Sequence, residues 1–374
     1  MMANILISLL GDQTVPIVLL IQDERFSHID DYVFVTTQEM EQKSRLGQIL
    51  AATLLEEGRY QSIKVPPEYP SMLIQVLEEE LTLDPEDHYY VNLTGGTKMM
   101  SVGLYQFFIQ HSSSITAEMF YKPIGKNAFI RVYPEHQQEE VPLTYHITIQ
   151  QYLVCYGIQI VDQKEEQEWT PPTALTERLL QDYIKRKFSN KLRDELNKLR
   201  KDYDRKKQKA AYDFEIGPAL KEYLQEIAYP IPSNGKLSKP EIFYFTGGWL
   251  EAYLLQSLQQ KLGFSESYLR KNINIQRRNL DGDKVKNEFD IVFVKDNTLH
   301  IIEAKTALSY SHIDLTIFKL QALRQEMGLR VKAYLFTPSI LGKYSKKAEE
   351  RANLYNIKIF DQKDFLNDFV DFHP

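Results

Sequence analysis

The chain has 374 residues, of which 43% are hydrophobic, and its formal net charge is −6. This length predicts two or three globular domains, each with its own core. The only cysteine, Cys155, excludes an internal disulfide and, with no Cys/His cluster, a structural zinc site of the usual kind, so we expect a reducing, cytoplasmic setting.

The first 22 residues are apolar enough to imitate a signal peptide, but they lack a basic leader and are interrupted by Gly11, Asp12 and Gln13. They favour a strand over residues 3–10, a turn, and a helix that begins near Pro16. No apolar run approaches the roughly 20 residues that span a bilayer, so we expect no membrane partner.

Alternating strand and helix patterns fill roughly the first 110 residues. Residues 31–37 form a second apolar run, and a helix with apolar positions from Met40 to Leu54 follows it. Residues 71–81 predict another helix, and residues 88–110 predict a strand, a turn and a helix. This order predicts an α/β unit with a parallel, Rossmann-like sheet, whose ligand crevice lies at the carboxyl ends of the strands. Strands at 115–123 and 128–134 are expected to form a closing hairpin.

The sequence NLTGGTKMM, residues 92–100, places a glycine-rich turn at one such strand end. It is not an NTPase phosphate loop, because Met99 stands where a hydroxyl would hold magnesium. The backbone N–H groups of Gly95, Gly96 and Thr97, at a helix start, offer an anion site, and Lys98 adds charge. The alternative is a plain tight turn with Lys98 in solvent. The acidity of this half and the absence of Gly-x-Gly-x-x-Gly argue against a dinucleotide cofactor.

Positive charge is concentrated in the second part of the chain. Residues 1–150 contain 9 Lys and Arg against 20 Asp and Glu, whereas residues 151–374 contain 36 against 31. The densest stretch, residues 185–209, has 12 basic and 4 acidic side chains. It is either a solvated helix with i,i+4 ion pairs or a surface that attracts a phosphate backbone. Polar, proline-containing breaks at 163–173 and 228–240 flank this helical, charged region.

Residues 287–306 contain two strand patterns joined at Asp296-Asn297, a dipeptide suited to a tight turn. If those residues form the tip, Asp290 faces Glu303, and Lys305 lies on the same face of the sheet. Facing carboxylates repel unless something positive lies between them. Oxygen ligands of this kind suit Mg²⁺ or Mn²⁺, so we expect a metal site rather than a hydrated surface.

A third carboxylate comes from an upstream helix. Glu251, Leu255, Leu258 and Leu262 recur at helical spacing, so Glu251 lies on an apolar stripe and is expected to point inward. Its role is either that of a metal or water ligand or that of an acid stabilised by the start of the helix.

The arrangement Glu251, then Asp290, then Glu303-Ala304-Lys305 resembles the restriction-endonuclease-like superfamily, with its D…(D/E)-x-K signature. The resemblance implies metal-dependent phosphodiester hydrolysis, with Asp290 and Glu303 as metal ligands, Glu251 as an accessory ligand and Lys305 activating water or stabilising charge. In that superfamily a later helix often adds a polar residue, for which Gln321 is the candidate.

The first 135 or so residues resemble the ligand-sensing CARF domain of CRISPR-associated proteins, through SLLGDQTVP (8–16) and NLTGGTKMM (92–100). With the nuclease signature, the whole chain resembles a CRISPR ancillary nuclease of the kind switched on by cyclic tetra-adenylate. The resemblance implies a homodimer whose paired turns hold one cyclic oligoadenylate. Its contact candidates are Asp12, Gln13, Thr14, Thr37, Thr94, Gly95, Gly96, Thr97 and Lys98.

We therefore expect a Rossmann-like sensor domain over residues 1–145, a linker with the charged helices over 146–235, and a restriction-endonuclease-like α/β domain over 236–374. The expected activity is metal-dependent cleavage of single-stranded DNA, RNA or both, with nicking of duplex DNA as an alternative, activated by cyclic tetra-adenylate in type III CRISPR antiviral defence. Two alternatives stay open. One is a non-catalytic regulator gated by a cyclic oligonucleotide, and the other is a constitutive repair or restriction nuclease.

Overall fold

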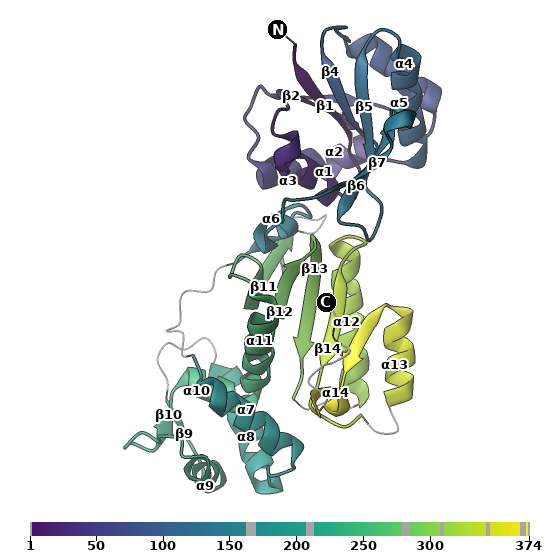
Figure 1. The fold of residues 1–374 in the computed structure, drawn as a ribbon. Helices are drawn as coiled ribbons and strands as arrows, with labels where there is room; N and C mark the ends of the chain where they lie inside the picture. The colour runs from purple at the N-terminus through teal and green to yellow at the C-terminus, as the bar shows by residue number, and fades with distance from the viewer. Residues whose placement is uncertain are drawn as a thin grey trace.

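The computed structural model describes residues 2–161, 170–206, 213–278, 284–306, 310–341, 345–366 and 372. Its main features are a seven-stranded sheet built from the N-terminal part of the chain and a six-stranded sheet built mainly from the C-terminal part. The two sheets lie end to end, with helix α6 (Ile149–Val154) between them (Figure 1).

The N-terminal sheet has the strand order β3-β2-β1-β4-β5-β6-β7. The first five of these strands run parallel, which confirms the predicted α/β sheet, and β6 and β7 continue it antiparallel. The predicted hairpin is present as β5 and β6, whereas β3 and β7 were not predicted. The strands are β1 Asn4–Leu9, β2 Asp31–Thr36, β3 Tyr60–Lys64, β4 His88–Asn92, β5 Thr116–Tyr121, β6 Ala128–Tyr133 and β7 Glu139–Pro142.

Helices cover both faces of this sheet. Helices α4 and α5 pack on one face and α1 and α3 on the other, and α1 is buried along nearly its whole length. The single helix expected from Met40 to Leu54 is divided into α2 and α3, because Ser44 adopts a left-handed conformation with φ 54° between them. The helices are α1 Val15–Gln22, α2 Gln38–Gln42, α3 Arg45–Thr53, α4 Pro70–Glu80 and α5 Lys98–His111, with short 3₁₀ turns η1 Glu24–Phe26 and η2 Glu135–Gln137.

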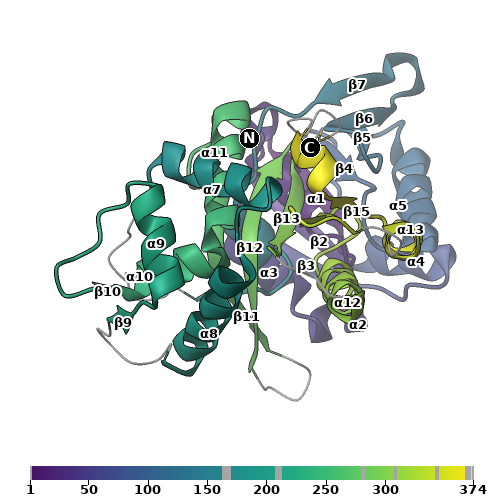
Figure 2. The same cartoon turned by 90° about the horizontal axis from the view of Figure 1, so that it is seen from below.

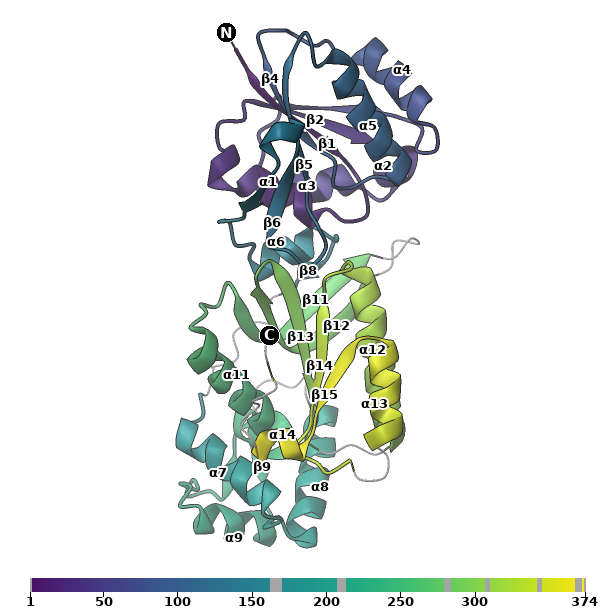
Figure 3. The same cartoon turned by 45° about the vertical axis from the view of Figure 1, so that its right-hand side comes forward.

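The C-terminal sheet has the order β15-β14-β13-β12-β11-β8. Helix α11 lies on one face, and α12 and α13 lie on the other (Figure 3). The strands are β8 Gln159–Ile160, β11 Leu269–Arg278, β12 Lys284–Lys295, β13 Thr298–Ala304, β14 Lys332–Phe336 and β15 Ile357–Phe360, and the helices are α11 Trp249–Leu262, α12 Tyr310–Glu326, α13 Ser345–Leu354 and α14 Gln362–Leu366.

The segment predicted to link the two halves packs into the C-terminal unit. Leu179, Leu192 and Leu220 belong to the same buried cluster as Ile291 and Phe293 of the sheet. Seen from below, α8, α9 and α10 lie on the side of α11, away from α12 and α13 (Figure 2). The elements are α7 Thr173–Ile184, α8 Asn190–Lys206, β9 Phe214–Glu215, α9 Pro218–Glu226, β10 Lys236–Leu237, α10 Lys239–Phe243 and the π-helical turn η3 Tyr244–Gly248.

The register of the β12–β13 hairpin is the one that an Asp296-Asn297 tip requires. Ile291 pairs with Ile302, and Lys295 pairs with Thr298. Asp296 and Asn297 both have positive φ, 49° and 57°, as a two-residue hairpin turn of this kind demands. None of the helices in the described ranges combines the length and apolar character needed to cross a membrane.

Candidate functional site

The β12–β13 hairpin brings three of the predicted catalytic side chains together. The Lys305 Nζ lies 3.2 Å from Asp290 Oδ2 and 2.8 Å from Glu303 Oε1. The Ala304 N–H donates to Asp290 Oδ2 over 2.7 Å and fixes that carboxylate. Asp290 is 9% exposed and Glu303 3%, because the neighbouring positions of both strands are apolar and covered on both faces. The hairpin therefore holds two buried carboxylates beside a partly exposed ammonium group.

Glu251 approaches the same site from α11. It stands in the first turn of this helix, directly after the π-helical turn in which Gly247 has a φ of 152°. Burial and the proximity of Asp290 raise its pKa well above the usual value. Among the described residues its buried Oε2 has no hydrogen-bond partner. The prediction that Glu251 points inward is therefore confirmed.

The two hairpin carboxyl groups differ in their electrostatics. Burial and the neighbouring Glu303 raise the pKa of Asp290. Burial also opposes ionisation of Glu303, but Lys305 and Lys319 outweigh it and hold the pKa of Glu303 below its usual value. The pKa of Lys305 is raised because Asp290 and Glu303 outweigh its desolvation. Glu303 is therefore an anion between two cations.

Lys319 is a member of this cluster that the sequence reasoning missed. It projects from α12, and its Nζ lies 2.9 Å and 2.8 Å from the two Glu303 carboxylate oxygens. Gln321, the residue proposed from the later helix, is two positions further and so lies on a different side of α12. Lys319 could have been found from the sequence, because it follows Thr316 by one helical turn and stands next to the buried Leu320.

The predicted metal site has ligands of the right chemical type, but its three carboxylates are not assembled into a metal-binding group in the described structure. Within the described part of the chain no three His, Cys, Asp or Glu side chains form a group that could hold a metal ion. In the observed arrangement the Lys305 and Lys319 ammonium groups neutralise Glu303. All three carboxylates nevertheless offer oxygen ligands of the type that Mg²⁺ and Mn²⁺ prefer, and the buried, unpartnered Oε2 of Glu251 beside Asp290 is an oxygen that a cation would satisfy.

The basic helix α8 borders this site. Arg200 acts on the Glu251 carboxyl electrostatically, and its guanidinium stacks 5.1 Å from the centre of the Phe243 ring. Several basic side chains of the region are exposed beside it: Lys185, Arg186, Lys187, Lys191, Arg193, Lys198, Lys201 and Arg205. Of the positive stretch found in the sequence, Arg200 is the residue that the structure shows to act on the carboxylate cluster.

The glycine turn lies at the carboxyl edge of the N-terminal sheet, between β4 and α5. Gly95 and Gly96 have positive φ, 119° and 59°. A Cβ at Gly95 would lie 2.4 Å from Leu9 O, and a Cβ at Gly11 would lie 2.5 Å from Gly96 N. The turn after β1 and the turn after β4 therefore touch backbone to backbone, and this contact requires glycine.

The side chains of this edge have distinct partners. Thr94 Oγ1 accepts from the Lys122 N–H, while Thr97 caps α5 and donates to Pro67 O over 2.7 Å. Thr37 caps α2 by accepting from the Met40 N–H. Lys98 is exposed and has no ion-pair partner within the described ranges, and in the same ranges the N–H groups of Gly95 and Gly96 donate to no protein acceptor. Of the three N–H groups that the sequence predicted as an anion site, that of Thr97 donates to Met100 Sδ over 3.4 Å, so only those of Gly95 and Gly96 are left without a protein acceptor in the described part of the chain.

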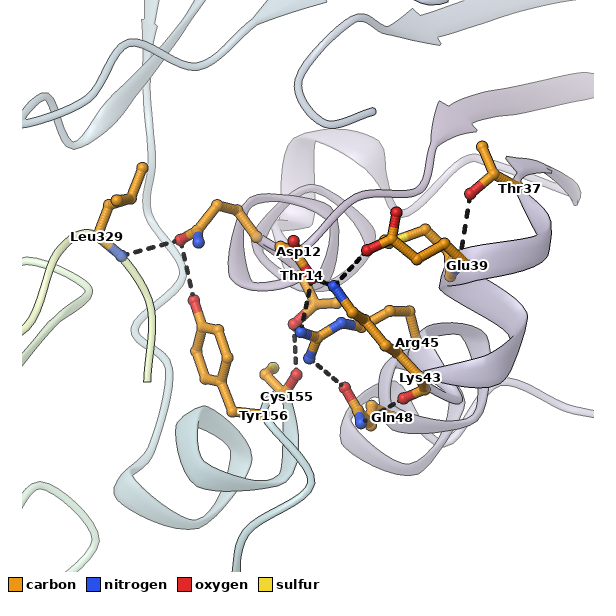
Figure 4. A network of polar contacts seen from close by, with 12 residues as sticks. Asp12, Thr14, Thr37, Glu39, Lys43, Arg45, Gln48, Cys155, Tyr156 and Leu329 are labelled. Carbon is orange, nitrogen blue, oxygen red and sulfur yellow. Dashed lines mark hydrogen bonds and ion pairs between the residues drawn. The ribbon is translucent and has the colours of Figure 1, made fainter. Parts of the chain in front are cut away.

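The side chains of the three residues after Gly11 have partners outside the glycine turn (Figure 4). Asp12 pairs with Lys43 and Arg45, each over 2.9 Å. Thr14 is fully buried and donates to Cys155 O, and Gln13 Oε1 accepts from Tyr156 Oη and Leu329 N. Lys43 and Arg45 are thus cations beside the turn after β1 that the sequence reasoning missed. The sequence signal for Lys43 and Arg45 was the pair of basic residues at the break between helices α2 and α3.

Comparisons with known proteins match both halves. Two family models match: the Card1 CARF domain over residues 5–152 and the Card1-like endonuclease domain over residues 239–364. The crystal structure of protein VC1899 from Vibrio cholerae is similar with a TM-score of 0.76 at 19% identity, covering 98% of this chain and 96% of that one. Can2 from Sulfobacillus thermosulfidooxidans, solved in complex with cyclic tetra-adenylate, is similar with a TM-score of 0.72 at 22% identity, covering 98% of each chain. At these identities the two structures show a shared fold, and no curated protein matches the chain.

Proposed function

We propose that this chain, which carries a Card1-type CARF domain and a Card1-like endonuclease domain, is a metal-dependent endonuclease that cyclic tetra-adenylate activates in CRISPR antiviral defence. The observation that carries the proposal is the cluster of Asp290, Glu303 and Lys305 with the orphaned oxygen of Glu251. The glycine turn supplies the second half of the argument, because its free backbone donors suit phosphate binding without hydrolysis.

The residues of the cluster divide the chemistry between them. Asp290, Glu303 and Glu251 would hold a Mn²⁺ or Mg²⁺ ion, which would supply Lewis-acid activation of the phosphate and of a water. Lys305 holds a positive charge between the carboxylates, where it stabilises the negative charge that develops on the scissile phosphate. Lys319 helps to keep Glu303 ionised by binding both of its carboxylate oxygens.

The substrate that we propose is single-stranded DNA or RNA. The exposed basic side chains of α8 border the carboxylate cluster and offer phosphate contacts that carry no base sequence information. Arg200 over Phe243 places a guanidinium and an aromatic ring at the same border, which suits a flexible strand with unstacked bases.

The active form that we propose is a homodimer joined through the sensor domains. Helices α4 and α5 expose an apolar group beside the glycine turn that consists of Tyr69, Met72, Met99 and Val102. A second copy placed on this face would bring two glycine turns together around one cyclic ligand with two-fold symmetry.

The test is a cleavage assay with single-stranded DNA, single-stranded RNA and supercoiled plasmid, each with and without Mn²⁺ and cyclic tetra-adenylate. We expect cleavage of a single-stranded substrate only when both additions are present. Cleavage without the activator would favour a constitutive nuclease, and no cleavage under any condition would favour a non-catalytic regulator.

A further inference from the structure

The two halves of the chain meet through polar contacts at several places. Asn297, at the tip of the catalytic hairpin, donates to Asn127 Oδ1 and Tyr145 O and accepts from the Ile147 N–H. Arg330 donates to the carbonyl groups of Pro123 and Lys126 in the β5–β6 loop. All of these sensor-side partners lie outside the two turns that touch at the proposed ligand edge.

Gln13 is different, because it belongs to the turn after β1 and yet contacts the nuclease half. Its Oε1 accepts from the Leu329 backbone N–H over 3.1 Å and from Tyr156 Oη over 3.3 Å (Figure 4). Gly328 lies so close that a Cβ there would be 2.2 Å from Tyr156 Oη and 2.8 Å from Gln13 Oε1. One carbonyl oxygen of the sensor therefore holds the segment that follows α12.

The Gln13–Leu329 hydrogen bond is connected to one proposed site on the sensor side and to another on the nuclease side. On the sensor side, Gly11 touches Gly96 of the glycine turn, and Asp12 is held by Lys43 and Arg45. On the nuclease side, α12 ends at Glu326 and carries Lys319, whose ammonium group binds both oxygens of Glu303. A rigid helix thus joins the Gln13 contact to the carboxylate cluster.

We infer that Gln13 is the positioning residue that couples the ligand turn to the nuclease site, by fixing the carboxyl end of α12 and through it the Lys319–Glu303 pair. The inference rests on the proposed function and specifies how that site is regulated. A ligand that moves the paired turns shifts Gln13, and α12 passes the shift to Lys319. The ligand acts by favouring one of two arrangements of this helix.

The test compares two variants of equal side-chain length in the full-length protein. Gln13→Met removes the acceptor oxygen, whereas Gln13→Glu keeps an oxygen that accepts from Leu329 N–H and Tyr156 Oη. We expect saturating cyclic tetra-adenylate to stimulate cleavage by Gln13→Met about 5- to 150-fold less than by the wild type, the range of typical coupling between sites. Stimulation of Gln13→Glu should stay close to that of the wild type.

The order of the two variants separates coupling from ligand contact. If Gln13 touched the activator directly, the added negative charge of Gln13→Glu would repel its phosphates and impair activation more than Gln13→Met does. That order, or normal stimulation of Gln13→Met, would overturn the inference while leaving the proposed function intact. Absence of stimulation in the wild type would instead overturn the proposed function, and the inference with it.

A variant on the nuclease side gives an independent measurement. Gly328→Ala forces a methyl group against Tyr156 and Gln13, whereas Gly263→Ala introduces an alanine at a similar positive φ with nothing within 4 Å. We expect Gly328→Ala, but not Gly263→Ala, to reduce stimulation, with both variants folded by circular dichroism. Equal stimulation of the two variants would also overturn the inference.

Discussion

Glu303 is paired with two ammonium groups from different elements, Lys305 after β13 and Lys319 on α12. Without Lys319, burial would oppose ionisation of Glu303 with less compensation, so its pKa would rise. We expect Lys319→Met to move the acidic limb of the cleavage–pH profile to higher pH and to slow cleavage at neutral pH.

Two control variants test whether this effect comes from the positive charge of Lys319. Lys319→Arg keeps the cation and should leave the acidic limb near that of the wild type, and Lys346→Met removes an exposed lysine of α13 and should change nothing. An acidic limb that does not move in Lys319→Met would contradict the electrostatic role of this lysine.

The free energy of unfolding is expected to depend on pH through the buried side chain of Lys122. It is 2% exposed, and its Nζ donates to Lys126 O. Burial and the nearby Arg330 lower its pKa to about 7. The unfolded chain keeps this proton up to about pH 10.4, so above about pH 7 unfolding takes up a proton and stability rises with pH, by at most about 1.4 kcal/mol per unit.

The check is urea unfolding of the wild type and of Lys122→Met at about pH 7 and about pH 9. The free energy of unfolding should rise more steeply with pH in the wild type, because the variant lacks the proton uptake. Equal slopes in the two proteins would show that Lys122 does not titrate in this range.

The glycine turn, as a structural element, depends on two properties of glycine: its tolerance of positive φ and its lack of a Cβ that would meet neighbouring backbone. Gly95 and Gly58 both have positive φ, but only at Gly95 would a Cβ meet backbone, 2.4 Å from Leu9 O. Gly58→Ala should therefore cost only the conformational strain of about 1–2 kcal/mol, whereas Gly95→Ala should cost more and should weaken activator binding. Urea unfolding and titration with labelled cyclic tetra-adenylate measure both effects. Similar losses in the two variants would contradict the close packing of the turns.

The next prediction concerns binding of the substrate by helix α8. Reversing Lys198 and Lys201 to glutamate should raise KM for a single-stranded substrate and reduce the dependence of binding on salt, because phosphate contacts release counterions. The same reversal of Lys346 and Lys347 on α13 changes net charge equally, but it lies on the opposite side of the sheet. Equal increases in KM would mean that only net charge matters and that α8 is a solvated surface.

The elements differ in how far the sequence could predict them. The β12–β13 register followed from a two-residue turn and a period of two, so the meeting of Asp290, Glu303 and Lys305 was predictable from local rules. The contact of Lys319 with Glu303 was not, because it depends on how α12 lies across the sheet. The same holds for Gln13, whose partner Leu329 is distant in sequence. Strand β3 was missed because it alternates weakly, with exposed Gln61 and Ser62.

At the scale of the whole molecule, the two proposed sites lie in separate units of one chain. One buried cluster includes residues of both units, among them Leu10 and Tyr156 on the sensor side and Ile301 and Met327 on the nuclease side. A continuous core of this kind transmits displacement rather than absorbing it, because packed interiors have low compressibility. We therefore expect a displacement at the sensor turn to reach α12 of the nuclease unit without being absorbed where the two units meet.

We expect one chain to sense the activator with the glycine turn and to cut nucleic acid with the carboxylate cluster. The most direct measurement is the initial rate of cleavage of a single-stranded substrate with Mn²⁺ as cyclic tetra-adenylate is titrated, for the wild type, Lys98→Met and Glu303→Gln. We predict that Lys98→Met shifts the half-activating concentration upward with little change in the maximal rate. Glu303→Gln should bind the activator yet lose cleavage by at least about 100-fold. A Lys98→Met curve that superposes on the wild type, or cleavage that persists in Glu303→Gln, would contradict the account.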